Sequence, residues 1–244
     1  YKRSGDTFTK LPNPSALPTG SADGCAFSPD NNYLAVSHSS SLYITIYKRS
    51  GDTFTKLPNP SALPTGNAYG CAFSPDNNYL AVVYYDSPYI IIYKRSGDTF
   101  TKLPNPSALP TGNAYGCAFS PDNNYLAVVY YDSPYIIIYK RSGDTFTKLP
   151  NPSALPAGNG RGCAFSPDNN YLAIANTKSP CITIYLNEQK TYIHTLSEIS
   201  KEYFAYAPKG KIGVAKESKP AGELVQATLF PALYNLTNNG NGGN

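Results

Sequence analysis

Histidine is nearly absent from this sequence, which contains only His38 and His194 among its 244 residues. Acid–base and nucleophilic catalysis need several titratable groups that converge on one site, and a lone histidine rarely forms one. We expect His38, at the end of a predicted strand, to be a surface substitution. Phosphate-binding loops, hydrolase nucleophile motifs and zinc motifs are missing as well. We therefore expect no enzymatic activity, no cofactor and no bound metal.

Cysteine is also scarce, and the five cysteines form neither a CxxC pair nor a spacing typical of metal ligands. Four of them hold the same place in a repeated unit, and Cys71 shares a strand face with Phe73, as a small core residue would. Cys181 replaces a tyrosine of two other copies and is interpreted as a core or strand residue. We expect free structural thiols rather than disulfides. The four equivalent cysteines are Cys25, Cys71, Cys117 and Cys163.

Charge and long apolar runs are limited too. Charged residues make up 15% of the chain and the net charge is +4, so specific nucleic-acid binding is not expected. The sequence has no apolar run of about 18 residues, which a membrane span would need. It also has no basic segment followed by an apolar one, so no signal peptide is visible in this chain.

What the sequence does contain is repetition. Residues 47–92 and 93–138 are the same 46-residue string, and diverged copies occupy 1–46 and 139–184. A unit of this length cannot bury a core alone, so it must stack on its neighbours. The copies are therefore expected to share one continuous core.

Each copy contains four short runs that are rich in β-branched and aromatic residues and bounded by turn residues. In the second copy, strands are predicted over 70–74, 79–85, 89–95 and 100–103. The proline-rich stretch 104–112 is unsuited to a helix or a central strand and is expected to cross to the next unit. The predicted fold is all-β, a β-propeller of four-stranded antiparallel blades.

The stretch CAFSPDNNYLAV, residues 71–82, resembles the VAFSPDGxxLA segment of WD-repeat propellers. The resemblance covers about residues 1–185, and Tyr93-Lys94 stands where that family has Trp-Asp. The chain is also similar to repeat propellers of phages and Gram-positive bacteria that belong to tails or cell surfaces. This resemblance implies a virion, extracellular or cell-surface location.

Five blades are expected in total. A degenerate fifth blade is read at 203–236, with Phe8–Leu11 as the strand that closes the ring, and the alternative is a separate small β element there. The predicted organisation is therefore repeats with a connecting strand over 1–202, this C-terminal element, and a flexible Gly/Asn tail at 237–244.

Differences between the copies fall in two places, where the proline-rich link enters the first strand and around the turn between the second and third strands. In a four-stranded meander both places lie at the same end of the blade, the variable rim. Two explanations stay open, tolerated loop change after duplication and a binding surface. The candidate ligand-binding residues on this rim are Tyr69, Tyr84, Tyr85, Asp86, Tyr115, Tyr130, Tyr131, Asp132 and Arg161.

Phenol rings beside carboxylates suit a sugar or a protein partner, although about half of these tyrosines are expected to be core residues. The sequence thus favours a non-enzymatic adhesion propeller, such as a phage tail or cell-surface protein, that recognises a glycan or surface receptor. The alternative is a structural subunit of a virion, tail or filament, whose partners are neighbouring subunits in a homo-oligomer.

Overall fold

The computed structural model of the chain describes residues 1–186, 193–194 and 225–226. The chain divides into two compact units, residues 1–187 and 188–244. In the second unit, β18 (Ile193–His194) pairs with β19 (Val225–Gln226). The rest of the predicted element at 203–236 and the tail at 237–244 lie outside the described residues, as does most of the segment that links them to the repeats.

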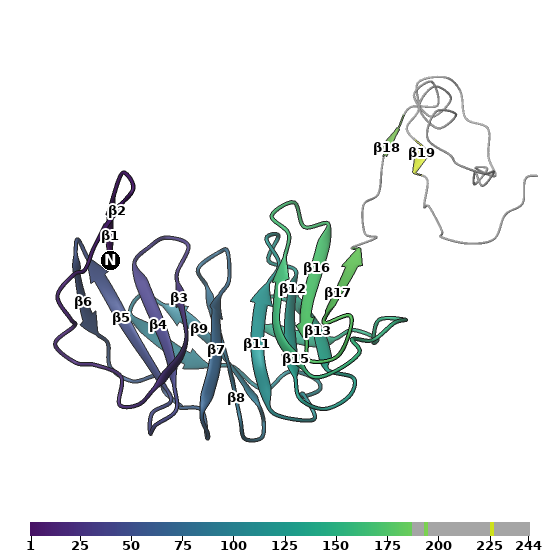
Figure 1. The fold of residues 1–244 in the computed structure, drawn as a ribbon, viewed down its shortest axis with the longest axis horizontal. Coiled ribbons are helices and arrows are strands. Elements are labelled where there is room, and N and C mark those ends of the chain that lie inside the picture. Colours follow the sequence, from purple (N-terminus) through teal and green to yellow (C-terminus); the bar gives the residue numbers. More distant parts are fainter. Residues whose placement is uncertain (187–192, 195–224, 227–244) are drawn as a thin grey trace, which may run out of the picture. The chain divides into compact units, whose positions relative to one another are not determined.

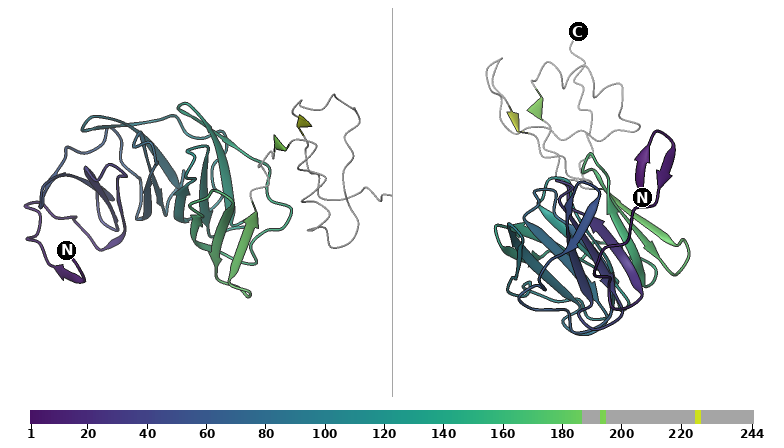
Figure 2. Two further views of the ribbon diagram at one scale, coloured as in Figure 1. Left: turned by 90° about the horizontal axis from the view of Figure 1, so that it is seen from above. Right: turned by 90° about the vertical axis from the view of Figure 1, so that its left-hand side faces the viewer.

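The first unit is built of antiparallel sheets that follow one another along the chain (Figure 1), as Figure 2 shows from two further sides. No helix occurs in the described ranges, and so none there could cross a membrane. Blade one comprises β3 (Ala22–Phe27), β4 (Tyr33–His38), β5 (Ile44–Ser50) and β6 (Thr53–Lys56). Blade two comprises β7 (Ala68–Phe73), β8 (Tyr79–Tyr84), β9 (Ile90–Ser96) and β10 (Thr99–Lys102). Blade three comprises β11 (Ala114–Phe119), β12 (Tyr125–Tyr130), β13 (Ile136–Ser142) and β14 (Thr145–Lys148).

Blade four has three described strands, β15 (Gly160–Phe165), β16 (Tyr171–Asn176) and β17 (Ile182–Leu186). Ahead of blade one, β1 (Lys2–Ser4) and β2 (Thr7–Thr9) form the N-terminal hairpin and pair only with each other. The predicted all-β fold with repeated four-stranded sheets is confirmed, and the strands lie within two residues of their predicted bounds. The predicted closing strand at Phe8–Leu11 overlaps β2, which pairs with β1, and most of its expected partner in the element at 203–236 lies outside the described residues, so closure of the ring stays a prediction.

The turn between the first and second strands of each blade follows from its sequence, Ser-Pro-Asp-Asn-Asn. In blade two, Oδ1 of Asp76 accepts hydrogen bonds from the Ser74 hydroxyl at 2.5 Å and the Asn78 amide at 3.1 Å. Asn77 has a φ of 61°, a conformation that asparagine tolerates better than most residues. The predicted role of this aspartate as a cap for local amides is confirmed.

The core lies between the blades, because side chains alternate between the two faces of every strand. The forward face of a blade is the one turned toward the next blade, and the rear face is turned toward the preceding blade. Blade two buries Tyr79, Ala81 and Ile92 forward against blade three. It buries Leu80 and Tyr93 on its rear face, against blade one.

Two corrections concern residues near the turns. His38 is not a surface residue: it is fully buried, with Nε2 3.1 Å from the Thr45 hydroxyl. Cys181 is neither a core nor a strand residue, because it is exposed and the third strand begins one residue later. Its φ of 63° is close to the φ of 67° at Tyr89, the equivalent residue of blade two.

Candidate functional site

The first strand of each blade begins with a β-bulge, where the pairing with the second strand skips one residue. In blade two the register passes from Ala68 to Gly70 and leaves Tyr69 as the extra residue. A bulge bends the strand and turns the extra side chain away from the regular alternation. We call the four extra residues the bulge row, and they are Asp23, Tyr69, Tyr115 and Arg161.

The bulge row is continuous because the first strands of successive blades lie unusually close together. A Cβ atom added to Gly70 would lie 3.0 Å from the carbonyl oxygen of Tyr115, and one added to Gly116 would lie 3.2 Å from the Cα of Gly162. Glycine next to each bulge therefore permits the close approach of neighbouring backbones.

Three side chains of the bulge row, those of Tyr69, Tyr115 and Arg161, are in contact in this order. The rings of Tyr69 and Tyr115 have centroids 5.1 Å apart, and the guanidinium carbon of Arg161 lies 4.4 Å from the Tyr115 ring centroid. Tyr85 adds a third ring, 6.4 Å from that of Tyr69 in an edge-to-face arrangement. Burial, followed by the neighbouring Tyr115 and Asp23, raises the pKa of the Tyr69 phenol. The row thus runs from a carboxylate through two phenols to a guanidinium.

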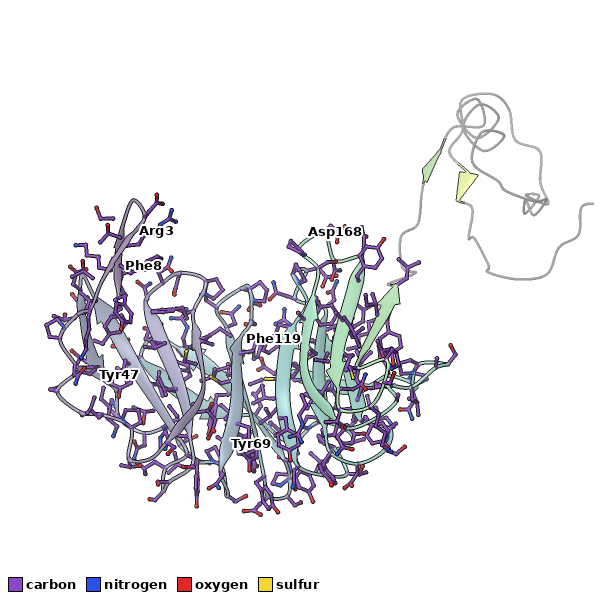
Figure 3. All side chains as sticks on the ribbon, in the orientation of Figure 1. Arg3, Phe8, Tyr47, Tyr69, Phe119 and Asp168 are labelled. Atoms are coloured by element: carbon purple, nitrogen blue, oxygen red, sulfur yellow. The ribbon has the colours of Figure 1, made fainter. Side chains whose placement is uncertain are left out.

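Figure 3 shows Tyr69 at the end of the strands opposite to Arg3 and Asp168. At the end that carries Tyr69, the proline-rich link meets the turn between the second and third strands: the Tyr85 amide donates to the Asn67 carbonyl at 2.9 Å. At the other end, Arg95 lies 3.4 Å from Asp30 of the preceding blade. The two kinds of turn therefore lie at opposite ends of the blades, and the differences between copies gather at one of them.

Not every predicted ligand-binding residue is accessible. Tyr84 and Tyr130 are each only 2% exposed and belong to the core, so the prediction that they bind ligand on the rim is wrong. Asp86 and Asp132 lie against Gly66 and Gly112 of the proline-rich links. Tyr85 and Tyr131 are about half exposed, and Tyr69, Tyr115 and Arg161 form the bulge row. Asp23 was missed, although its position differs between copies and aligns with Tyr69.

The described residues contain no group of three or more His, Cys, Asp or Glu side chains that could hold a metal ion. Three of the repeated thiols pack between blades: Sγ of Cys71, for example, lies 3.7 Å from the Ala35 carbonyl oxygen. Burial raises the pKa of the Cys71 thiol to about 12. Such a thiol is a structural residue rather than a nucleophile.

The chain matches no protein-family model and no curated protein sequence. Among solved structures it is similar to a protein of Bacteroides uniformis assigned as a 6-phosphogluconolactonase, with 19% identity and a TM-score of 0.58 over 68% of this chain and 50% of that chain. A second protein with this assignment, from Bacteroides fragilis, shows 16% identity and a TM-score of 0.53 over 68% and 50% of the two chains. Hydrazine synthase of Kuenenia stuttgartiensis shows 16% identity and a TM-score of 0.52 over 69% and 53%.

These likenesses show a propeller-like all-β fold, and the chain spans about half the length of the structures that it matches. No family model supports the WD-repeat resemblance or the phage and Gram-positive one. The prediction of an adhesion or tail propeller that recognises a glycan or receptor is wrong, because the structural neighbours are assigned as 6-phosphogluconolactonases. The alternative prediction of a virion, tail or filament subunit is wrong on the same finding.

Proposed function

We propose that this protein binds a small, hydroxylated organic anion, such as a sugar acid or a sugar phosphate, at the bulge row. One observation carries the proposal. The bulges turn four residues out of the strands in the order acid, phenol, phenol, base, and the side chains of the two phenols and the base are in contact. Bulges beside binding sites commonly serve to aim a side chain.

Each part of the row suits one part of such a ligand. A guanidinium holds a carboxylate or phosphate through two parallel hydrogen bonds, which is the role of Arg161. Asp23 accepts hydrogen bonds from ligand hydroxyls at the opposite end. The faces of the Tyr115 ring are occupied by Tyr69 and Arg161, so the phenols offer the ligand their hydroxyls rather than a stacking platform.

The structural neighbours support the same class of ligand. Two of them are assigned as 6-phosphogluconolactonases, and that name refers to an anionic, sugar-derived lactone. At 19% and 16% identity their activity does not transfer with the fold. We therefore propose only that the bulge row binds this class of ligand. Whether it also hydrolyses a lactone is tested by a separate experiment.

Calorimetric titration tests the proposal with 6-phosphogluconate, gluconate, glucose 6-phosphate and neutral glucose. We expect the anions to bind and glucose not to bind. A hydrogen bond to a charged group contributes about 1.5–3 kcal/mol, so Arg161→Gln is expected to weaken anion binding by about 10- to 100-fold. Equal affinity for glucose and 6-phosphogluconate, or no effect of Arg161→Gln, would contradict the proposal.

Arg49→Gln is the matched control, because Arg49 is an exposed arginine at the opposite end of the strands and bonds only to backbone carbonyl groups there. It should leave anion binding unchanged. Hydrolysis of 6-phosphogluconolactone by the wild type, measured against Arg161→Gln, then decides whether the same row also carries out chemistry.

A further inference from the structure

The rings of Tyr69 and Tyr85 meet at the variable rim of blade two. Their centroids are 6.4 Å apart, and the angle between the ring planes is 69°. The backbone fixes both residues, because Tyr69 is the extra residue of a bulge and the Tyr85 amide donates to the Asn67 carbonyl at 2.9 Å. Tyr69 is half-buried and Tyr85 is 47% exposed, so solvent reaches both rings. We call this pair of rings the tyrosine corner.

Two carboxylates flank the tyrosine corner. A Cβ atom added to Gly24 would lie 2.9 Å from the Tyr69 carbonyl oxygen, so Asp23, the residue before Gly24, adjoins Tyr69 on the side of blade one. Asp86 directly follows Tyr85 in the sequence. Burial is the largest cause of the raised pKa of the Tyr69 phenol, and the charges of Asp23 and Asp86 add to it. Both carboxylates therefore lie within electrostatic reach of the corner.

Neither Asp23 nor Asp86 forms an ion pair within the described part of the chain, and both are exposed. Five other aspartates are paired with a lysine or an arginine, and all five lie in turns at the end of the strands opposite to the variable rim. The tyrosine corner thus combines aromatic faces with two negative charges that no described lysine or arginine neutralises. The paired aspartates are Asp30, Asp52, Asp76, Asp98 and Asp144.

Blade three shows that a ring at this position accepts a cation. Its equivalent of Tyr69 is Tyr115, and the guanidinium carbon of Arg161 lies 4.4 Å from the centroid of that ring. A cation within about 6 Å of a ring centroid is attracted to the negative face of the π system. No described lysine or arginine lies over the Tyr69 ring in this way, since its neighbours in the bulge row are Asp23 and Tyr115. The chain itself supplies a cation to Tyr115 but none to the tyrosine corner.

We propose that the tyrosine corner binds a small organic ammonium ion, with the two rings against its alkyl groups and the two carboxylates balancing its charge. Aromatic rings grouped around a cation are the usual means by which proteins recognise alkylated ammonium groups. A metal ion suits the corner less well, because Ca²⁺ takes about six to eight oxygen ligands and the corner offers two carboxylates. The aromatic faces contribute to binding an alkylammonium but do not coordinate a metal.

This site goes beyond the proposed anion site. Tyr85 and Asp86 lie outside the bulge row, and the ammonium ion makes no use of Arg161. Asp23 belongs to both sites, since a carboxylate accepts a hydrogen bond from a hydroxyl and also attracts a cation. The rim therefore has an acidic, aromatic end at blades one and two and a basic end at blade four.

Proton NMR of choline in the presence of the full chain tests the proposal, with sodium chloride holding the ionic strength constant. Methyl protons that lie on an aromatic face shift upfield, so we expect the trimethylammonium signal to move upfield as protein is added. The affinity should be in the millimolar range, because the contacts are few and exposed. The neutral isostere of choline, in which a tert-butyl group replaces the trimethylammonium group, should bind about tenfold more weakly.

The two identical copies provide matched variants. Tyr85→Ala should weaken choline binding by about 3- to 10-fold and Asp86→Asn by about 2- to 5-fold. Tyr131→Ala and Asp132→Asn change the same residues of blade three, where Arg161 already occupies the ring face, and should leave choline binding unchanged. Tyr131 is 46% exposed, so the two tyrosine substitutions are equally placed on the surface. Circular dichroism of the four variants, compared with that of the wild type, establishes that they are folded.

Three outcomes would overturn the proposal: no upfield shift with the wild type, equal affinity for choline and its neutral isostere, or equal effects of Tyr85→Ala and Tyr131→Ala. Arg161→Gln separates this site from the anion site. It should weaken anion binding and leave choline binding at least as tight as in the wild type, because it removes a positive charge from the rim. A parallel loss of both ligands in Arg161→Gln would contradict a separate ammonium site. Choline binding without anion binding would support the tyrosine corner and contradict only the proposed function.

Discussion

The Tyr79 hydroxyl donates a 2.5 Å hydrogen bond to Oδ1 of Asp144, across the interface between blades two and three. Lys94 binds the other carboxylate oxygen at 2.6 Å. The Lys94 hydrogen bond, followed by that from Tyr79, lowers the pKa of Asp144 below its ordinary value. Tyr33 and Asp98 repeat this arrangement between blades one and two. A single aspartate in the outer turn thus fixes the position of the preceding blade.

Tyr79→Phe should therefore destabilise the protein without changing its fold. The ring stays buried, but the Asp144 carboxylate loses one donor, and a hydrogen bond to a charged group contributes about 1.5–3 kcal/mol. We expect the free energy of unfolding in urea to fall by about this amount. Tyr85→Phe, at a tyrosine 47% exposed, should stay within about 0.5 kcal/mol of the wild type. If Tyr79→Phe and Tyr85→Phe lowered the free energy of unfolding equally, the Tyr79–Asp144 hydrogen bond would not stabilise the contact between the blades.

His38 should make stability depend on pH in a defined window. Burial lowers the pKa of His38 below its ordinary value of 6.5. The folded state therefore binds a proton less readily than the unfolded state, so the contribution is complete above pH 6.5 and is lost as the pH falls through the folded-state pKa. The slope is at most about 1.4 kcal/mol per pH unit for one proton.

Unfolding measured from pH 7.5 to pH 5 should show this loss in the wild type and a flatter profile in His38→Tyr. Tyrosine occupies the equivalent positions 84 and 130, so the replacement suits a blade of this kind. Asp76 and Asp98 have pKa values lowered from 3.8, so they titrate below this window. Identical profiles for the wild type and His38→Tyr would contradict the assignment.

The sequence predicted the blades well because their strands are short and their turns carry strong local signals. Pro75 and Asp76 mark one turn, and Gly97, with a φ of 57°, marks another. Burial of His38 was missed because the strand pattern placed it at the end of the second strand, whereas its pairing with Ala22 puts it in the core position that Tyr84 occupies in blade two.

The candidate site was predicted only in part. Tyr69, Tyr115 and Arg161 were identified because they lie on the rim where the copies differ. The bulges themselves could not be read from the sequence, because one extra residue in an edge strand leaves the alternation on either side intact. The alternation placed Tyr84 near the rim, whereas the pairing of Tyr84 with Ala68 puts its side chain into the core.

The thiols should separate into two reactivity classes. Burial raises the pKa of Cys71 and Cys163 to about 12 and that of Cys117 well above its ordinary value. At pH 8 a thiol of pKa 12 is ionised in about one molecule in 10⁴, so it reacts slowly. Cys25 and Cys181 are exposed and should account for the fast phase with a disulfide reagent.

Cys181→Ser should remove about half of that fast phase. Peptide mapping after brief labelling identifies which thiols reacted. Rapid labelling of Cys71 in the folded protein would contradict its placement between blades one and two.

Gly70 and Gly162 occupy the same position in their blades but have different surroundings. A Cβ at Gly70 would lie 3.0 Å from the Tyr115 carbonyl oxygen, whereas a Cβ at Gly162 has nothing within 4 Å. Gly70→Ala forces two neighbouring strands apart and should cost about 1–3 kcal/mol. Gly162→Ala should change the stability of the isolated chain by less than about 0.5 kcal/mol. Both are compared with the wild type by urea unfolding. Equal losses for Gly70→Ala and Gly162→Ala would contradict the close approach of the first strands of blades two and three.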